Sequence, residues 1–138
     1  KEPDRYIFPI DGSVTAAYSE QPVYSKTLED WRAHTGIDLA ADEGAEIHAA
    51  AAGTVSDVYS DALFGYTVII KHTGGTQSLY ANLSWDVTVA PGQTVKEGEL
   101  IGYAGSTAAC EIEEPPHIHF ELSRDGKHLN PGEYLVRE

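Results

Sequence analysis

Two histidines separated by one residue lie in the stretch PPHIHFEL, which runs from Pro115 to Leu122. Polar and apolar residues alternate after the prolines, which predicts a strand, and side chains alternate between the two faces of a strand. His117, His119 and Glu121 are therefore expected on one face. Imidazole is the commonest metal ligand in proteins. The pair is a candidate metal site, although one buried and one exposed structural histidine would give the same pattern.

A second group of candidate ligands lies in the segment HTGIDLA, which begins at His34. Gly36 and its β-branched neighbours argue against a helix, and in an extended segment residues 34, 36 and 38 share a face. His34 and Asp38 are then expected to flank a glycine that leaves the space between them open.

Catalytic zinc sites use three protein ligands and keep one position for water. His34, Asp38 and one histidine of the later pair would supply such a set, and the other histidine would serve acid–base chemistry. The helical HExxH motif is absent, so this site would lie on strands.

Taken together, the HxxxD segment, the HxH pair and the run SLYANL between them resemble the lysostaphin/LytM-type peptidoglycan endopeptidases. The similarity extends from about Tyr6 to Leu135 and includes the segment VAPGQTV and the dipeptide Asn130-Pro131. Neither histidine motif is specific alone, but the combination is specific.

The resemblance implies that His34, Asp38 and His119 bind Zn²⁺ and that His117 is a catalytic histidine. It implies that the substrate is the peptide cross-link of peptidoglycan. It also implies an extracytoplasmic location, in the cell wall, secreted, or anchored through a segment that precedes Lys1.

The sequence departs from this family in the run Tyr80-Ala81-Asn82-Leu83, where active members usually carry a second catalytic histidine in place of Asn82. An asparagine amide donates a hydrogen bond but does not carry a proton at neutral pH. A positioned proton-transfer group contributes a factor of about 10²–10⁴, and a neutral donor near a developing oxyanion contributes about 10²–10³. We therefore expect Asn82 to act as a catalytic hydrogen-bond donor in a weakened enzyme that still binds zinc.

A binding function is the alternative. The same domain occurs in family members that have lost catalytic residues and act as interaction modules, including stage II sporulation protein Q and cell-division activators of amidases. Asn82 resembles the sporulation branch, in which zinc would serve stability alone and the partner would be a protein. The complete ligand set beside His117 favours the hydrolase.

The other ionisable candidates have simpler expected roles. Glu121 is a candidate to orient a histidine ligand by a hydrogen bond to the ring. The alternative is that Glu121 is an exposed carboxylate on the strand. Cys110 is the only cysteine, so no internal disulfide forms, and as a fourth ligand it would close the open position. His72 is expected to make structural hydrogen bonds, His48 to be structural or exposed, and His128 to face solvent.

Composition narrows the classes of partner. The 138 residues include 9 Lys and Arg against 22 Asp and Glu, for a formal net charge of −13. This balance disfavours nucleic acids and anionic membranes, because both need clustered cations. No apolar run approaches the length of a membrane span.

Short strands separated by glycine turns predict one all-β domain over residues 1–138, with a core from about 6 to 135. The expected architecture is an antiparallel β-sandwich or partly closed barrel with little helix. Residues 18–33 are polar, and we expect a long loop there, with one helical turn around Thr27 to Trp31, forming a wall of the cleft.

Overall fold

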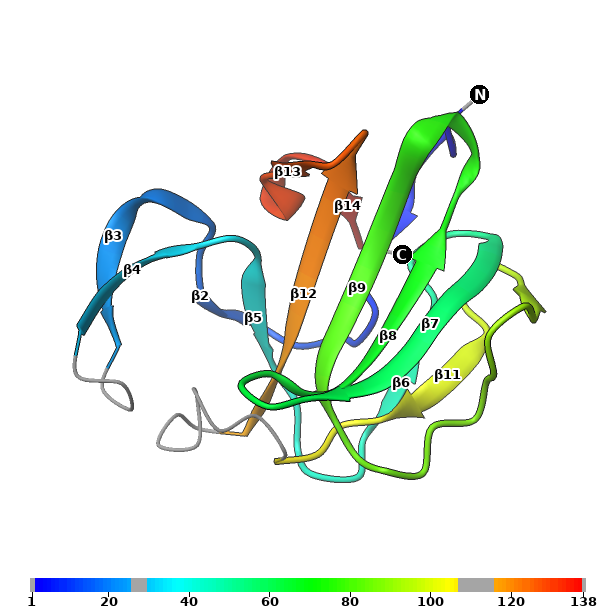
Figure 1. Ribbon diagram of the computed structural model, residues 1–138, viewed down its shortest axis with the longest axis horizontal. Coiled ribbons are helices and arrows are strands. Elements are labelled where there is room, and N and C mark those ends of the chain that lie inside the picture. The colour runs from blue at the N-terminus through cyan, green and yellow to red at the C-terminus, as the bar shows by residue number, and fades with distance from the viewer. Residues whose placement is uncertain (1, 26–29, 107–115, 138) are drawn as a thin grey trace.

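The computed structural model describes the backbone of residues 2–25, 30–106 and 116–137, and the side chains of these residues except 21–25 and 30–33. β-Strands dominate this part of the chain, and no α-helix occurs in it (Figure 1). Nor does any helix among these residues have the length and apolar character to cross a bilayer. The predicted antiparallel all-β fold with little helix is confirmed, and the described strands do not close into a barrel.

The largest sheet has eight strands in the order β10-β7-β8-β9-β12-β5-β2, with β13 paired beside β12. All neighbours in it are antiparallel. Its strands are β2 (Val14–Ala16), β5 (Ile37–Ala40), β7 (Gly53–Asp61), β8 (Gly65–Lys71), β9 (Thr76–Leu83), β10 (Thr94–Val95), β12 (His117–Arg124) and β13 (Lys127–Leu129).

Three strand pairs complete the fold. The pair of β1 and β14 is parallel, and the other two pairs are antiparallel. Their bounds, with those of two 3₁₀ turns, are β1 (Tyr6–Ile7), β14 (Leu135–Val136), β3 (Ser19–Ser25), β4 (Asp30–His34), β6 (Glu46–His48), β11 (Leu100–Tyr103), η1 (Thr73–Gly75) and η3 (Pro131–Glu133).

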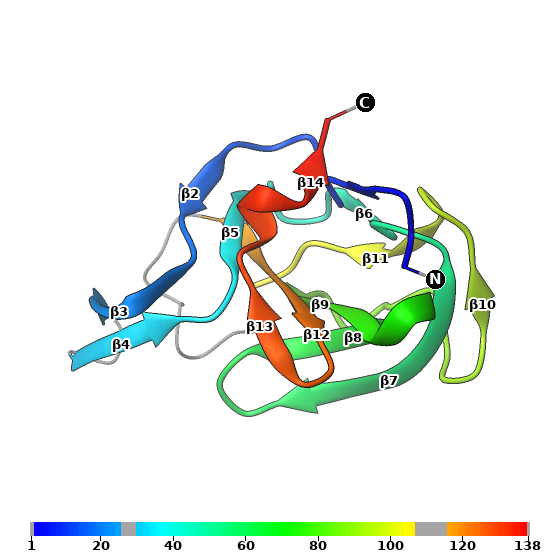
Figure 2. The same cartoon turned by 90° about the horizontal axis from the view of Figure 1, so that it is seen from above.

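The β3–β4 hairpin corrects the prediction of a long irregular loop over residues 18–33. Val23 pairs with Arg32, and Tyr24 pairs with Trp31. A two-stranded ribbon that projects from the body of the molecule, as Figures 1 and 2 show, does not need a regular apolar face, so the sequence lacks the usual alternation. The helical turn expected around Thr27 to Trp31 falls partly on residues 26–29, which lie outside the described residues. Trp31 itself lies in β4.

The core lies between the large sheet and the β6–β11 pair, which forms a second layer behind it (Figure 2). Ile118, Phe120 and Leu122 of β12 are fully buried in this core, as the alternation of the sequence predicted. The ring of Tyr80 from β9 packs edge-on against Phe120, with 5.2 Å between centroids. This packing fixes β12, and the opposite face of β12 carries the predicted site.

Candidate metal centre

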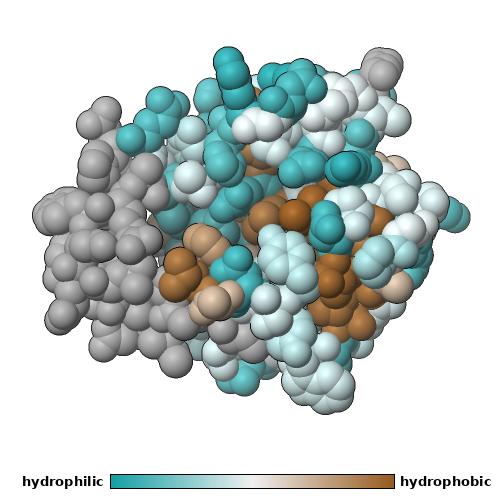
Figure 3. Space-filling model, in the orientation of Figure 1, coloured by the Kyte–Doolittle hydropathy of each residue, from teal (hydrophilic) through white to brown (hydrophobic). Residues whose placement is uncertain are grey.

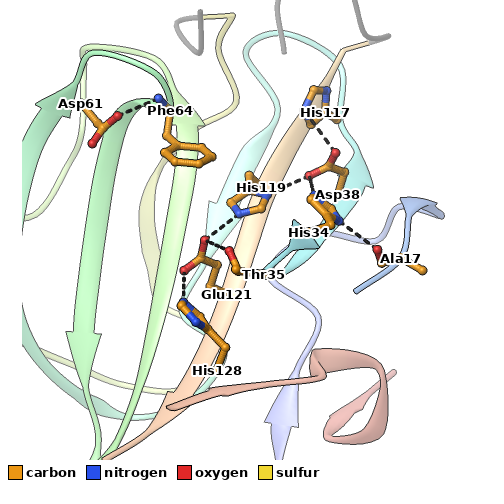
Figure 4. Close-up of polar contacts among 10 residues, drawn as sticks. All are labelled: Ala17, His34, Thr35, Asp38, Asp61, Phe64, His117, His119, Glu121 and His128. Carbon is orange, nitrogen blue, oxygen red and sulfur yellow. Dashed lines mark hydrogen bonds and ion pairs between the residues drawn. The ribbon is translucent and has the colours of Figure 1, made fainter. Parts of the chain in front are cut away.

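The register of β12 with its two neighbours brings the candidate ligands together. His119 lies directly opposite Asp38 of β5 and opposite Ala81 of β9. Directly opposite residues on antiparallel strands project from the same face, so the imidazole and the carboxylate meet, and the small Ala81 side chain leaves room beside them. His34, the last residue of β4, reaches the same place from the side (Figure 4).

Three side chains converge closely enough to share one ion. The ligand atoms of His34, Asp38 and His119 all lie within 4.8 Å of one another. Asp38 Oδ1 is 2.9 Å from His119 Nδ1 and 3.3 Å from His34 Nε2. His117 approaches the other oxygen of the carboxylate, with Nε2 3.8 Å from Asp38 Oδ2. The structure therefore gathers all four residues that the two motifs singled out.

The electrostatics of this cluster keep Asp38 ionised. Burial alone would raise the pKa of Asp38, but hydrogen bonds and charge interactions with His119 and His34 hold it well below its usual range. Burial also disfavours the charged form of His34, yet the hydrogen bond and the charge of Asp38 outweigh burial and raise its pKa. A metal ligand must be deprotonated, and Asp38 meets that condition at neutral pH.

The chemistry of the donor set fits Zn²⁺. Two imidazole nitrogens and one carboxylate oxygen are usual zinc ligands, and three protein ligands leave one position for water or substrate. Ligand atoms of a tetrahedral zinc ion lie roughly 3.3 Å apart, given bonds of about 2.0–2.1 Å. The separations of 2.9 and 3.3 Å from Asp38 Oδ1 are close to that value.

The ring of His34 is oriented by a backbone contact. His34 Nδ1 lies 2.9 Å from the carbonyl oxygen of Ala17. A carbonyl only accepts, so Nδ1 carries the proton and the lone pair of a neutral ring lies on Nε2, which faces Asp38.

Outer contacts surround His119. Its Nε2 lies 2.9 Å from Glu121 Oε2, the Thr35 hydroxyl donates to the same oxygen at 2.9 Å, and His128 Nε2 lies 3.1 Å from Glu121 Oε1. The Phe64 ring stacks on the His119 ring, with centroids 5.3 Å apart and planes 22° from parallel. Sequence reasoning named Glu121 and missed the other three. The position of Thr35 between two candidate ligands was the one available signal.

Asn82 is bonded to the backbone beside the site. Its side-chain amide donates to the carbonyl of His117 at 2.7 Å, its backbone amide donates to the carbonyl of Phe64 at 2.9 Å, and its own carbonyl accepts from Gly105 at 2.9 Å. Its φ of 62° is left-handed, a conformation that asparagine adopts more readily than most residues. Asn82 thus ties the start of β12 to the β7–β8 turn, and its predicted catalytic contribution stays a prediction.

The space beside Gly36 is filled, which corrects the expectation that this glycine leaves a gap between His34 and Asp38. A Cβ atom at this position would lie 2.2 Å from the carbonyl oxygen of Phe120 and 2.8 Å from Glu121 Cγ. Gly36 therefore allows β12 to approach closely, and that approach brings His119 to the other ligands.

Two further histidines lie apart from this cluster. His72 is buried and bonded to the carbonyl of Ala52 and the hydroxyl of Ser78, both at 2.8 Å, which confirms its predicted hydrogen-bonding role. His48 is half-buried, and its Nδ1 lies 3.0 Å from the carbonyl of Gly98. Cys110 and residues 111–114, three of which are glutamates, lie outside the described residues.

An apolar strip continues along the sheet from the site. Half-buried Ile69 of β8 lies directly opposite half-buried Leu79 of β9, which lies opposite Glu121 of β12. Figure 3 shows hydrophobic side chains gathered over this part of the sheet, with polar surface around them.

The sequence matches one known family. A family model described as Peptidase family M23 matches residues 32–131. The chain is 39% identical over 104 residues to DD-carboxypeptidase/endopeptidase Mpg of Neisseria meningitidis serogroup B, which covers 75% of this chain and 23% of that protein. It is 35% identical over 102 residues to stage II sporulation protein Q of Bacillus subtilis, which covers 72% of this chain and 35% of that protein.

Solved structures share the fold. The structure of the SpoIIQ–SpoIIIAH pore-forming complex contains a chain with a TM-score of 0.81 and 27% identity, and the match covers 95% of this chain and 90% of that one. A zinc-containing peptidase from Vibrio cholerae gives a TM-score of 0.80 at 25% identity, covering 94% of this chain and 39% of that one. The catalytic domain of lysostaphin from Staphylococcus simulans, at 22% identity, has the same fold, with a TM-score of 0.74 over 89% of this chain and 91% of that one.

Proposed function

The chain belongs to peptidase family M23, as its resemblance to the lysostaphin-type enzymes predicted, and from this premise we propose that it is a zinc-dependent hydrolase of peptidoglycan peptides. The observation that carries the proposal is the convergence of His34, Asp38 and His119 within 4.8 Å, with His117 beside them. The three converging residues would hold the zinc ion. Bound zinc would supply Lewis-acid polarisation of the scissile carbonyl and a more acidic water.

His117 is the proton-transfer group in this proposal. It is 2% exposed, and its Nε2 lies 3.8 Å from Asp38 Oδ2. Pairing with Ala40 of β5 and the amide of Asn82 both fix its backbone. A group held in this way can take a proton from the attacking water and deliver it to the leaving amine.

The substrate of the proposal is the peptide cross-link of peptidoglycan, bound along the Ile69–Leu79 strip. An extended peptide lying on this face of the sheet could place one peptide bond at the metal centre while its neighbours contact the strip. The similarity to a DD-carboxypeptidase/endopeptidase supports this substrate class. Similarity to relatives named as lipoproteins supports an extracytoplasmic location, attained by secretion or by anchoring.

A protein-binding module is the second candidate. Asn82 offers an amide, already bonded to the backbone of His117, where active relatives usually offer an imidazole. The likeness to a chain of the SpoIIQ–SpoIIIAH complex supports the same reading. In a binding module, the metal would stabilise the fold and the sheet surface would contact a partner protein.

Digestion of purified peptidoglycan by the zinc-loaded chain, followed by release of new amino groups, tests the proposal. We expect release that a chelator abolishes and that His117→Ala lowers by about 10²–10⁴. His48→Ala is the matched control and should cleave normally, because His48 lies apart from the cluster. Bound zinc without any release would exclude the hydrolase on this substrate and favour the binding module.

A further inference from the structure

We propose that Thr35 and His128 are positioning residues that hold the Glu121 carboxylate against His119, so that His119 presents Nδ1 to the metal. The proposal deepens the metal site proposed above and does not depend on hydrolysis. Figure 4 shows the chain of contacts from Asp38 through His119 and Glu121 to His128, which runs along one face of β12.

Glu121 is the shared acceptor in this chain of contacts. Its Oε2 lies 2.9 Å from both His119 Nε2 and the Thr35 hydroxyl, and its Oε1 lies 3.1 Å from His128 Nε2. A carboxylate accepts hydrogen bonds and donates none. The three groups around it, the rings of His119 and His128 and the hydroxyl of Thr35, must therefore all be donors.

This requirement decides which nitrogen of His119 is free to bind a metal. If Nε2 carries a proton for Glu121, the lone pair of the neutral ring lies on Nδ1, which is 2.9 Å from Asp38 Oδ1. A lone pair and a carboxylate oxygen repel each other at that distance, so in the metal-free chain a proton on Nδ1 would occupy this contact, and a metal ion would take the place of that proton. Glu121 thereby directs Nδ1 and Asp38 toward a shared cation.

Thr35 and His128 are needed because a glutamate side chain has several rotatable bonds. Each holds one oxygen, and each comes from a different segment. Thr35 lies between β4 and β5 and bonds Oε2, whereas His128 lies on β13 and bonds Oε1. The carboxylate is thus fixed from both sides, with 13% of the Glu121 side chain exposed.

Zinc affinity of the whole chain, measured by competition with a chromophoric chelator, tests this arrangement. Glu121→Ala should weaken zinc binding about 10–100-fold, the usual cost of losing an outer partner of a ligand. Thr35→Val and His128→Ala should each weaken it by a smaller factor, on the order of threefold to tenfold. His48→Ala is the matched control, because His48 also lies beside a glutamate, Glu46, but apart from the metal cluster, and its affinity should not change.

A double-mutant cycle separates positioning from a general structural role. If Thr35 and His128 act through Glu121, their substitutions should have no further effect in the Glu121→Ala background. Additive losses, or unchanged affinity in both single variants, would overturn the proposal.

NMR of the metal-free chain gives a readout that does not require zinc. The His119 ring should carry a proton on Nε2 that exchanges slowly with water, and Thr35→Val and His128→Ala should each speed this exchange while His48→Ala does not. A wild-type chain that binds no zinc would contradict the proposed function, but this exchange measurement would still test the role of Thr35 and His128. Equal exchange rates in all variants would refute their positioning role.

Discussion

The β9–β12 part of the sheet carries a polar cluster on each of its faces, and the two clusters are built on opposite principles. On the inner face, His72 contacts Ser78, Ser78 contacts the Tyr80 hydroxyl at 2.7 Å, and that hydroxyl accepts from the backbone amide of Ala50 at 2.9 Å. On the outer face, His34, Asp38 and His119 direct ligand atoms at a common point. The inner cluster is a neutral chain of donors and acceptors, whereas the outer one contains charge.

The pKa shifts record this difference. Burial lowers the pKa of His72 and raises that of Tyr80 to about 12, so both stay neutral. The pKa of His34, by contrast, is raised despite its burial, because of Asp38. A satisfied neutral network stabilises the fold, while an arrangement that holds a carboxylate among imidazoles is suited to a cation. Histidine burial alone therefore does not distinguish a structural residue from a ligand, but the charge of its partners does.

The largest expected effect contrasts the two faces directly. His119→Ala should reduce zinc affinity by more than the roughly 10–100-fold that loss of an outer partner costs, because it removes a proposed ligand. Tyr80→Phe, on the inner face, should leave the affinity within about threefold of wild type. Chelator competition measures both variants, and equal losses would show that the two clusters are not independent.

A stability measurement tests the inner cluster by itself. Tyr80→Phe leaves the buried amide of Ala50 without its acceptor, so the free energy of unfolding of the metal-free chain should fall by about 1–3 kcal/mol. Tyr59→Phe, on a side chain that is 40% exposed, is the control and should change it by less than about 0.5 kcal/mol. Urea unfolding followed by circular dichroism provides the values, and a Tyr80→Phe variant as stable as wild type would contradict the role of the inner network.

Asn82 lies at the end of β9, and substitutions there test whether its amide or its backbone conformation matters. Asn82→Asp replaces the donor to the His117 carbonyl with an acceptor and should cost about 1–3 kcal/mol. Asn82→Gly keeps the left-handed φ without strain and should cost less. Urea unfolding ranks the two, and a glycine variant less stable than the aspartate variant would refute the importance of the amide.

The smallest expected effect is a pH dependence that arises on the inner face. The folded-state pKa of His72 is lowered from 6.5, so its contribution to stability is complete above about pH 6.5 and is lost as the pH falls toward the folded value. Below about pH 6.5 the unfolded chain binds the proton more readily, so wild-type stability should fall with acidification by up to about 1.4 kcal/mol per pH unit from this group. His72→Gln should remove this part of the slope, and His48→Gln should not. Identical slopes in wild type and His72→Gln would contradict the assignment.

Local sequence patterns predicted that β12 is a strand with an apolar face and a polar face, because this alternation is visible in consecutive residues. The convergence of His34, Asp38 and His119 depends on the pairing of β5 with β12. In the sequence, the ligand chemistry of the two motifs suggested a shared site, and the family resemblance identified His119 as the third ligand. The contacts of Phe64 and His128 arise from separate hairpins and had no local signal. Of the inner network, the sequence indicated only the hydrogen-bonding role of His72, because Ser78 and Tyr80 have the pattern of ordinary strand residues.

Gly36 has a consequence for mutational tolerance. A side chain there would collide with the backbone of β12 at Phe120, and the strand that would have to move carries His119. A saturation scan scored by activity would therefore rank Gly36 with the metal ligands, although glycine has no side chain to offer a metal. In such a scan, Gly36→Ala distinguishes a loss of space from the loss of a ligand. Its single added methyl group changes none of the proposed ligands and removes only the room that β12 needs.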